Sequence, residues 1–443
     1  MTDYKKYFKN KKITVMGLGL LGRSIAYTKF LAECGAILTV TDLKTKDQLA
    51  SSLKELSKYK NIRYVLGEHK LSDFKNVDMV IKSGGVPLDS IYIKEAKKNK
   101  IPVEMDASLF EQLAPEVQII GVTGTRGKTM TTMLIYELLK ANEKLLKCKV
   151  YAGGNIRGGA TLPLLTKVKA GDIVVLELDS WQLQGFGEAK TSPHISVFTS
   201  FMPDHMNYYK DDMKKYFTDK ANIFKYQKKG DTLVIRPGMK KLIPKTIKSK
   251  LIVVRAKGVE KYNFIVPGTN QLENLACAVE VAKLFKIPES SIKKVIKNFK
   301  GVEGRLQYVK TVKGVKIYND NNATTPEATI SGLEALGGKK NIILIAGGAS
   351  KGLQTSGLAK AIDKYCKDVV LFDGTGTEVL LLENKLKTPY RVVSSLREGA
   401  ELASGLAKKG DIVLFSPAFA SFGMFTNEYD RNDQFMKIVE KLK

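Results

Sequence analysis

Cysteine, histidine and tryptophan are scarce in this chain of 443 residues. None of its four cysteines belongs to a C-x-x-C pair, so we expect reduced thiols rather than a disulfide framework or a thiolate metal site. With only three histidines, a histidine-rich metal centre is excluded. Any bound metal must therefore be held mainly by oxygen atoms, which favours Mg²⁺.

Long apolar runs are absent as well. No stretch reaches the roughly 20 apolar residues that a membrane-spanning helix needs. Residues 1–6 lack the apolar core of a signal peptide. We therefore expect a cytoplasmic protein with no membrane span. Its length and its 44% hydrophobic content are ordinary for two or three domains with their own cores.

Negative charge is also in short supply, because 72 lysines and arginines face only 45 aspartates and glutamates, leaving a net charge of +27. Such a field attracts polyanions, nucleic acids among them. The lysines are spread along the whole chain and no nucleic-acid-reading module is recognisable, so we expect no nucleic-acid partner. A small polyanionic substrate would benefit from the same field.

Apolar patterning divides the chain into three segments, residues 1–106, 107–303 and 304–443. In each segment short apolar strands alternate with helical patterns, which predicts parallel sheets and an α/β fold. The expected strands are 13–16, 37–41, 62–65 and 79–81, then 117–122, 173–178, 195–199 and 232–235, and finally 315–318, 342–346, 369–372 and 412–415. The helices expected in the first two segments include 24–34, 47–56, 130–139 and 213–224.

The most informative motif is the stretch Gly121-Val-Thr-Gly-Thr-Arg-Gly-Lys-Thr129, which lies between an expected strand and an expected helix. Glycines let backbone N–H groups approach phosphate oxygens, and the helix N-terminus adds positive charge. Lys128 supplies a full charge, and Thr129 can place a hydroxyl on Mg²⁺. A strict G-x-x-x-x-G-K-[ST] pattern would need glycine at Val122, yet the layout still predicts a nucleoside triphosphate site. Its expected contacts are Gly124, Thr125, Arg126, Gly127, Lys128 and Thr129.

A second glycine turn, Gly17-Leu-Gly-Leu-Leu-Gly22, is followed by Asp42 twenty residues later, which matches the dinucleotide-binding fingerprint. A dinucleotide, a turn without ligand and a nucleoside diphosphate such as UDP on a sugar are all open interpretations. ATP and NAD sites rarely share one chain, which weakens the interpretation as a dinucleotide site. Ser83-Gly-Gly-Val-Pro87 offers a second small-residue loop at the same sheet edge, where a diphosphate should lie.

Two polar residues follow strands of the middle segment. Glu177 ends an apolar strand on the side of the phosphate loop and is placed to hold Mg²⁺, directly or through water. His205 follows the strand at 195–199 and also lies on the carboxyl side of the sheet. Lys220 lies in a helical pattern, and nothing in its spacing distinguishes it from other helix lysines.

Together these motifs resemble the Mur ligase family over nearly the whole chain. Any one motif is weak, but the ordered set is specific. In chain order it comprises the Gly17–Gly22 turn, Asp42, Thr-Gly-Thr-x-Gly-Lys-Thr (123–129), Gly-Asn-Ile (154–156), Leu-Glu-Leu-Asp-Ser-Trp-Gln-Leu (176–183), Asp-His-Met (204–206), Arg305, Asn-Asp-x-x-Ala-Thr (319–324), Gly-Gly-x-x-Lys (347–351) and Ser-Pro-Ala-x-Ala-Ser-Phe (416–422).

The resemblance implies an ATP-dependent amide ligase of peptidoglycan precursor synthesis. The expected reaction joins D-glutamate to UDP-N-acetylmuramoyl-L-alanine through an acyl phosphate, with Mg²⁺ at two sites. The resemblance also implies three domains and, we expect, a monomer. A Rossmann-like N-terminal domain (1–106) would bind the UDP substrate. A P-loop ATPase-like central domain (107–303), with a parallel or mixed sheet, would bind ATP. A Rossmann-like C-terminal domain (304–443) would bind the amino acid.

The family also implies roles at matching positions. Residues facing the UDP substrate would be Leu20, Leu21, Asp42, Ser83 and Gly84, with Asn155 near the reaction centre. Besides the phosphate loop, Asn274, Arg305 and Asp320 would contact ATP, and Thr129, Glu177, His205 and Lys220 would serve the metal ions. Lys220 matches a lysine that is carbamoylated by CO₂, and the catalytic set would be Lys128, Asn155, His205 and Lys220. The D-glutamate pocket would comprise Thr324, Lys351, Ser421, Phe422 and Tyr429.

The chain departs from the family pattern at Arg126, where asparagine is frequent, and at Asn322, where lysine is usual. Arg126 could replace the charge lost at Asn322. Other interpretations stay open. One is a related Mur-type or folylpolyglutamate-type ligase for another amino acid or acceptor, and another is a nucleotide-binding module without ligase activity.

Overall fold

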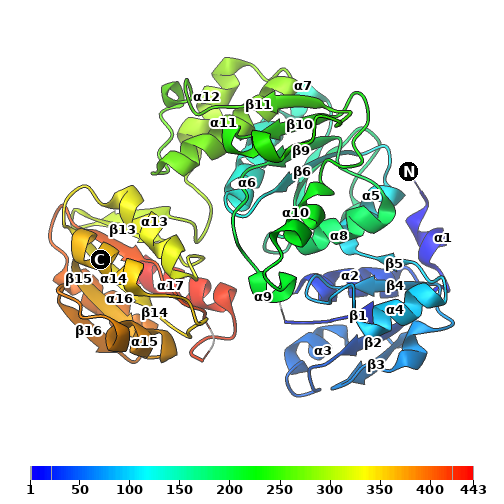
Figure 1. The fold of residues 1–443 in the computed structure, drawn as a ribbon, viewed down its shortest axis with the longest axis horizontal. Coiled ribbons are helices and arrows are strands. Elements are labelled where there is room, and N and C mark those ends of the chain that lie inside the picture. The colour runs from blue at the N-terminus through cyan, green and yellow to red at the C-terminus, as the bar shows by residue number, and fades with distance from the viewer. Residues whose placement is uncertain (1, 21, 422, 443) are drawn as a thin grey trace. The chain divides into compact units, whose positions relative to one another are not determined.

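The computed structural model describes residues 2–20, 22–421 and 423–442. The chain divides into two compact units, which are described separately. The first comprises Met1–Val259 with Glu273–Val295, and the second comprises Glu260–Leu272 with Ile296–Lys443. The first unit contains two β-sheets and the second contains one (Figure 1).

The first sheet has five parallel strands in the order β3-β2-β1-β4-β5. This order reverses between β1 and β4, so the loops that follow these two strands meet at the switch point where α/β sheets bind ligands. One face packs on α2 and the other on α4. The strands are β1 (Lys12–Met16), β2 (Ile37–Asp42), β3 (Ile62–Leu66), β4 (Met79–Lys82) and β5 (Val103–Glu104), and the helical segments are α1 (Tyr4–Phe8), α2 (Arg23–Glu33), α3 (Ala50–Leu56), η1 (Leu71–Phe74) and α4 (Ile91–Lys98).

The second sheet has six parallel strands in the order β11-β10-β9-β6-β8-β7. Its middle strands are buried along their whole length, as expected for a sheet covered on both faces. The strands are β6 (Gln118–Thr123), β7 (Val150–Gly154), β8 (Ile173–Glu177), β9 (Ile195–Phe198), β10 (Thr232–Ile235) and β11 (Lys250–Val253). The helical segments are α5 (Asp106–Leu113), α6 (Lys128–Lys140), α7 (Glu143–Leu146), η2 (Leu162–Thr166), α8 (Ser180–Ala189), α9 (Met206–Tyr209), α10 (Met213–Ala221) and η3 (Pro237–Leu242), with α11 (Thr269–Leu284) and α12 (Glu289–Asn298), most of whose residues belong to the first unit. η4 (Glu260–Tyr262) belongs to the second unit.

The third sheet has six strands in the order β12-β13-β17-β14-β15-β16, all parallel except β12. α13, α14 and α15 pack on one face, and α16 and α17 pack on the other. The strands are β12 (Gln307–Val312), β13 (Val315–Asn319), β14 (Ile342–Gly347), β15 (Cys366–Phe372), β16 (Tyr390–Val393) and β17 (Ile412–Phe415), and the helices are α13 (Pro326–Leu336), α14 (Ser356–Tyr365), α15 (Thr375–Glu383), α16 (Leu396–Leu406) and α17 (Glu428–Lys441).

These sheets confirm the predicted α/β class, and each expected strand overlaps an observed one. The expectation of parallel sheets is wrong at β12, which pairs antiparallel with β13. Lys313 and Gly314 connect the two strands with positive φ angles of 48° and 79°, which is the chemistry of a tight hairpin. The domain boundaries at residues 106 and 303 stay a prediction.

Two expectations from composition can be compared with the described residues. The four cysteines are free, as predicted. Among the helices of residues 2–20, 22–421 and 423–442, none combines the length and the apolar character needed to cross a membrane.

Candidate active site

The phosphate loop connects β6 to α6 at the carboxyl edge of the second sheet. Gly127 caps α6 with φ of 87°, and a Cβ there would lie 2.3 Å from Oδ1 of Asn274. A Cβ on Gly124 would lie 2.1 Å from Oγ1 of Thr199. Both positions therefore require glycine, because a side chain would meet packed atoms and strain the backbone. Lys128 donates from Nζ to the carbonyls of Gly124 at 3.0 Å and Thr125 at 3.1 Å, so the cation lies over the loop.

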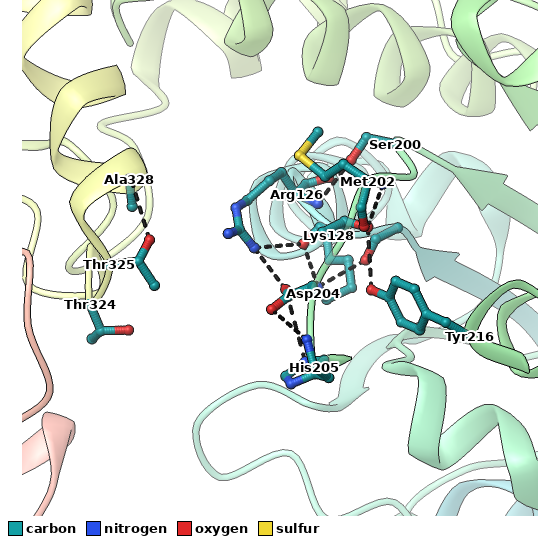
Figure 2. A network of polar contacts seen from close by, with 12 residues as sticks. Arg126, Lys128, Ser200, Met202, Asp204, His205, Tyr216, Thr324, Thr325 and Ala328 are labelled. Atoms are coloured by element: carbon teal, nitrogen blue, oxygen red, sulfur yellow. Dashed lines mark hydrogen bonds and ion pairs between the residues drawn. The ribbon is translucent and has the colours of Figure 1, made fainter. Parts of the chain in front are cut away.

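The segment after β9 fixes this loop from one side. Thr125 Oγ1 lies 3.1 Å from the carbonyl of Met202 and 3.2 Å from the hydroxyl of Tyr216. The backbone N–H of Arg126 donates to Oγ of Ser200 at 2.8 Å. Figure 2 shows Arg126, Ser200, Met202 and Tyr216 around Lys128 and His205. The conformation of the phosphate loop is therefore fixed by the segment after β9, which also carries His205.

Arg126 forms an ion pair with Asp204, with Nη1 and Oδ2 2.9 Å apart (Figure 2). Asp204 was not predicted as a site residue. Within the second unit, Asn322 accepts a hydrogen bond from Asn321 at 3.1 Å. The idea that Arg126 replaces a charge at position 322 stays a prediction.

Asn274, expected at the nucleotide, lies on α11 against the phosphate loop. Its Oδ1 accepts hydrogen bonds from Thr131 at 3.2 Å and from the guanidinium of Arg236. Arg236 also pairs with Glu273, with Nη1 and Oε2 2.8 Å apart. The buried arginine thus orients the amide, a role that the sequence did not indicate.

Glu177 ends β8 with its side chain only 1% exposed. Its Oε1 accepts a hydrogen bond from Nδ2 of Asn155 at 3.2 Å, while Oε2 is buried and has no hydrogen-bond partner. Asn155 Oδ1 in turn accepts from Nη2 of Arg23 at 2.7 Å, which connects α2 to this edge. A buried carboxylate oxygen without a partner costs free energy unless a ligand or ion satisfies it.

Lys220 lies on α10 and is also 1% exposed. Its Nζ donates to the carbonyl of Gly124 at 3.0 Å and lies 5.0 Å from the ring centre of Tyr216. Burial lowers the pKa of this amine well below its usual value, and the charge of Lys128 lowers it further. The structure therefore brings Lys220 to the phosphate loop, away from the solvated position of an ordinary helix lysine.

His205 precedes α9 with a φ of 54°, and its ring packs against Trp181 at a tilt of 45°, with centroids 4.6 Å apart. Burial lowers its pKa, whereas the nearby Asp204 carboxylate opposes this shift. A neutral imidazole at neutral pH can accept a metal ion or a proton. Thr129 is half-buried in the first turn of α6.

The donor set at this edge suits Mg²⁺, because Glu177 presents an unpartnered buried carboxylate oxygen. The described residues contain no group of three or more His, Cys, Asp or Glu side chains that could hold a metal ion. Glu177, His205 and Thr129 would hold it together with phosphate oxygens and water, as Mg²⁺ sites commonly do.

The residues expected at the UDP substrate lie at the switch point of the first sheet. Asp42 is buried at the end of β2, and its Oδ2 accepts from the N–H groups of Leu18 at 2.8 Å and Gly19 at 3.0 Å. Its carboxylate therefore holds the glycine turn in place. Ser83 packs against Gly17, where a Cβ would lie 2.3 Å from its Oγ, and Gly84 lies beside Trp181. Leu20 is half-buried in the same turn, and Leu21 lies outside the described residues.

In the second unit, Asp320 follows β13 and is held by two hydrogen bonds. Its Oδ1 accepts from the N–H of Leu306 at 2.9 Å, and its Oδ2 accepts from Oγ of Ser416 at 2.9 Å. Burial raises the pKa of this carboxyl to about 7. Arg305 lies next to Leu306, and its Nε is buried without a hydrogen-bond partner.

Three loops of the third sheet bring most of the expected D-glutamate residues together. Lys351 donates to Oγ1 of Thr324 at 3.0 Å. Ala349 and Ala420 exchange two backbone hydrogen bonds of 2.9 and 3.0 Å, which joins the glycine loop to the segment that carries Ser421. Tyr429 lies in the first turn of α17. Phe422 lies outside the described residues.

A buried arginine that the sequence did not indicate supports these loops. Arg431 on α17 is 0% exposed and donates to the side chain and carbonyl of Asn321, at 2.8 and 2.9 Å, and to the carbonyl of Phe419 at 3.3 Å. Burial lowers its pKa to about 10. One guanidinium thus fixes both segments that flank the expected pocket.

Comparison with known protein families gives one match for each sheet. The matching descriptions are "Mur ligase MurD-like, N-terminal domain" at residues 11–104, "Mur ligase middle domain" at 122–264 and "Mur ligase, glutamate ligase domain" at 304–419. They occur in the order in which the sheets follow one another.

Curated relatives match over nearly their full length. UDP-N-acetylmuramoylalanine–D-glutamate ligase of Borreliella afzelii is 36% identical, covering 98% of both chains. The enzyme of the same name from Roseiflexus is 35% identical over 97% of this chain and 98% of its own. The enzyme of the same name from Acetivibrio thermocellus is 33% identical over 100% of this chain and 99% of its own.

Solved structures share the fold at lower identity. UDP-N-acetylmuramate-alanine ligase MurC from Thermotoga maritima matches with a TM-score of 0.61 and 18% identity, covering 98% of this chain and 100% of its own. MurF ligase from the same organism, in complex with ADP, matches with a TM-score of 0.59 and 18% identity. This match covers 99% of this chain and 96% of the MurF chain. The chain therefore belongs to the Mur ligases, in the family of the UDP-N-acetylmuramoylalanine–D-glutamate ligases.

Proposed function

We propose that this enzyme joins D-glutamate to UDP-N-acetylmuramoyl-L-alanine with hydrolysis of ATP to ADP and phosphate, in peptidoglycan precursor synthesis. Its full-length likeness to ligases of that name supports the substrates. The observation that carries the proposal is the grouping at one sheet edge of Lys128 on the phosphate loop, the unpartnered oxygen of Glu177 and the buried amine of Lys220.

The first step is a phosphoryl transfer. An oxygen of the L-alanyl carboxylate attacks the γ-phosphorus of ATP, the bond to the β-phosphate oxygen breaks, and an acyl phosphate and ADP result. Lys128 and the N-terminus of α6 offset the repulsion between the carboxylate and the triphosphate. Asn155 would hold the muramoyl substrate near this centre, because its amide already lies between Arg23 and Glu177.

The second step is acyl transfer. The amine of D-glutamate attacks the carbonyl carbon of the acyl phosphate, the amine loses a proton, and the tetrahedral intermediate expels phosphate. Thr324, Lys351, Ser421, Phe422 and Tyr429 would form the D-glutamate pocket. The contact of Lys351 with Thr324 supports this grouping, since it sets a cation beside a hydroxyl donor.

The metal and nucleotide residues complete the proposal. Mg²⁺, at two sites, would neutralise charge on the phosphate oxygens, held by Thr129, Glu177 and His205. ATP would also contact Asn274, Arg305 and Asp320. Leu20, Leu21, Asp42, Ser83 and Gly84 would face the UDP group.

The neutral amine of Lys220 would react with CO₂ to form a carbamate, with release of one proton. Counted from the ammonium form, two protons leave and a cation becomes an anion. This reaction needs the neutral amine, and the burial that lowers the pKa of Lys220 favours that form. The carbamate would supply a further anionic oxygen ligand near Glu177 and His205.

The test of this function is phosphate release from ATP in the presence of UDP-N-acetylmuramoyl-L-alanine while the amino acid is varied. We expect release to depend on D-glutamate and to be slow with L-glutamate, glycine or a diamino acid. Release driven equally well by another amino acid would assign a related ligase activity. Release that ignores every amino acid would refute ligation.

A further inference from the structure

Lys82 is the last residue of β4 and directly precedes the Ser83–Gly84 loop. Its charged side chain is only 1% exposed. Nζ donates to the carbonyl of Val86 at 3.0 Å and to Oε1 of Gln184 at 3.1 Å. Val86 belongs to the same loop, whereas Gln184 lies on α8, beside the second sheet. The lysine therefore connects the loop expected at the UDP substrate to the half of the unit that carries the phosphate loop.

Gln184 continues this connection. While its Oε1 accepts from Lys82, its Nε2 donates to the hydroxyl of Tyr208 at 3.1 Å and to Oδ2 of Asp219 at 2.8 Å. Tyr208 lies on α9, three residues after His205, and Asp219 immediately precedes Lys220 on α10. One buried amide thus contacts the two segments that carry His205 and Lys220.

An apolar contact runs beside this polar one. The indole of Trp181, on the first turn of α8, lies under Gly84, where a Cβ would be 3.6 Å from Cβ of Trp181. The same indole packs against the tilted ring of His205, with centroids 4.6 Å apart, and edge-to-face against the ring of Tyr208, with centroids 5.5 Å apart. α8 also contacts β5 of the first sheet and α10. Movement of the Ser83–Gly84 loop would therefore change the positions of α9 and α10.

Stability does not explain a lysine at this position. Burial lowers the pKa of Lys82 to about 8, although the carboxylates of Asp179, Asp219 and Glu188 oppose the shift. Taking an ammonium group out of water costs free energy, and replacing a buried polar pair by apolar residues is often neutral or stabilising. The two hydrogen bonds of Lys82 fix the Ser83–Gly84 loop and α8 in relation to each other, which gives a reason for a lysine here besides stability.

We propose that Lys82 and Gln184 are positioning residues that couple binding of the UDP-linked substrate at the Ser83–Gly84 loop to the placement of His205 and Lys220. This proposal rests on the proposed function. Neither side chain is expected to touch the reacting atoms. They act through the loop and through α9 and α10.

The first test compares Lys82→Met with wild type. Methionine keeps most of the side-chain volume but removes the donor to Oε1 of Gln184 and to the carbonyl of Val86. Losing one buried hydrogen-bond partner corresponds to roughly tenfold in an equilibrium constant. We expect kcat to fall and KM for UDP-N-acetylmuramoyl-L-alanine to rise by roughly tenfold, with KM for ATP and D-glutamate close to wild type. Lys97→Met is the matched control, because Lys97 pairs with Glu188 of α8 at 2.7 Å but is 42% exposed.

The double variant Lys82→Met/Gln184→Leu separates positioning from folding. Replacing both partners removes the unsatisfied Oε1 of Gln184, while the carbonyl of Val86 stays without Lys82 and Asp219 keeps only the hydrogen bond from Tyr209. We therefore expect the melting temperature to recover part of the loss seen in Lys82→Met while kcat stays low. Recovery of kcat together with the melting temperature would show a purely structural role and overturn the proposal. So would a folded Lys82→Met variant with wild-type kcat and KM.

A binding readout keeps this result distinguishable from failure of the ligase assignment. Trp181 is the only tryptophan of the chain, so intrinsic fluorescence reports this junction directly. We expect UDP-N-acetylmuramoyl-L-alanine to change the emission of wild type, and Kd to rise roughly tenfold in Lys82→Met but not in Lys97→Met. Equal Kd values in wild type and Lys82→Met would refute the coupling even where D-glutamate-dependent turnover is intact. Absent turnover in wild type, with the Kd difference present, would refute the ligase function instead.

Discussion

At the scale of single residues, the site depends on a few polar atoms that the fold removes from water. Oε2 of Glu177 is buried without a partner, and the amine of Lys220 is buried against the backbone of the phosphate loop. Both arrangements cost free energy in the empty protein. A cation bound to the Glu177 carboxylate would explain the first arrangement. Reaction of the Lys220 amine with CO₂, which replaces its positive charge, would explain the second.

Lys220→Ala should lose most activity, because the site would lack the expected carbamate. Small carboxylates such as formate or acetate should restore part of kcat by taking its place. Steady-state assays with and without these anions measure the rescue. Lys214→Ala, at an exposed position of the same helix, is the control and should behave as wild type. Unchanged activity in Lys220→Ala, or loss without rescue, would contradict the carbamate.

Lys128→Ala should lower kcat by roughly 10²–10³-fold, since the charge over the phosphate loop stabilises the transferring phosphoryl group. The melting temperature should change little, because Lys128 is half-buried at the start of α6 and its Nζ donates to backbone carbonyls of the loop. Phosphate release at saturating ATP is the measurement, with the exposed Lys144→Ala as the matched variant. Near-wild-type turnover in Lys128→Ala would mean that ATP binds elsewhere.

Residues with a local motif could be predicted, and residues defined by burial could not. The glycines, Lys128 and Thr129 are recognisable because phosphate binding needs them at fixed spacing. Lys82, Arg236 and Arg431 resemble dozens of other basic residues in the sequence, and only the tertiary structure buries them. Lys220 belongs to this second group too, since a resemblance rather than its spacing drew attention to it.

At the scale of helices and strands, apolar runs predicted the buried strands well and the edge strands poorly. β11, β12 and β16 lie at sheet edges, and their exposed or polar residues break the apolar pattern. The helix expected at 47–56 is shorter, because α3 begins at Ala50. Edge strands are defined by the neighbour they pair with, which a single sequence does not reveal.

The contact between α5 and the segment after α8 should depend on pH. Glu111 accepts a hydrogen bond from Thr191, and burial raises the pKa of its carboxyl from the usual 4.5 to about 7. The folded state therefore binds a proton that the unfolded state releases above pH 4.5. The stabilisation from this group is full below pH 4.5 and is lost as the pH rises through 7, by about 3 kcal/mol at most.

Glu111→Gln keeps the acceptor for Thr191 and cannot ionise. Its melting temperature should therefore exceed that of wild type at pH 8, and the difference should shrink towards pH 5. Thermal melts of both proteins across this range measure the effect. A difference that stays constant with pH would mean that the Glu111 carboxyl titrates normally.

At the scale of the whole molecule, the residues assigned to one reaction are divided between two compact units. Lys128, Glu177 and Lys220 belong to the first unit, whereas Arg305 and Asp320 belong to the second. The sequence indicates that these residues lie in different parts of the chain, because their motifs follow one another in order. It does not indicate which buried contacts stabilise each unit.

The net charge of +27 should assist the capture of anionic substrates. Salt screens such fields beyond roughly 10 Å at 0.1 M ionic strength. We therefore expect kcat/KM for UDP-N-acetylmuramoyl-L-alanine to fall as NaCl is raised, while kcat at saturation changes less. Steady-state kinetics at several salt concentrations test this. A kcat/KM independent of salt would show that the surplus lysines do not steer the substrate.

The central claim is that the substrate carboxylate itself attacks ATP. It is tested most directly with UDP-N-acetylmuramoyl-L-alanine labelled with ¹⁸O in the alanyl carboxylate. During D-glutamate-dependent turnover, mass spectrometry of the released phosphate should find one labelled oxygen per molecule, carried over through the acyl phosphate. Phosphate free of label, with product still formed, would contradict this account.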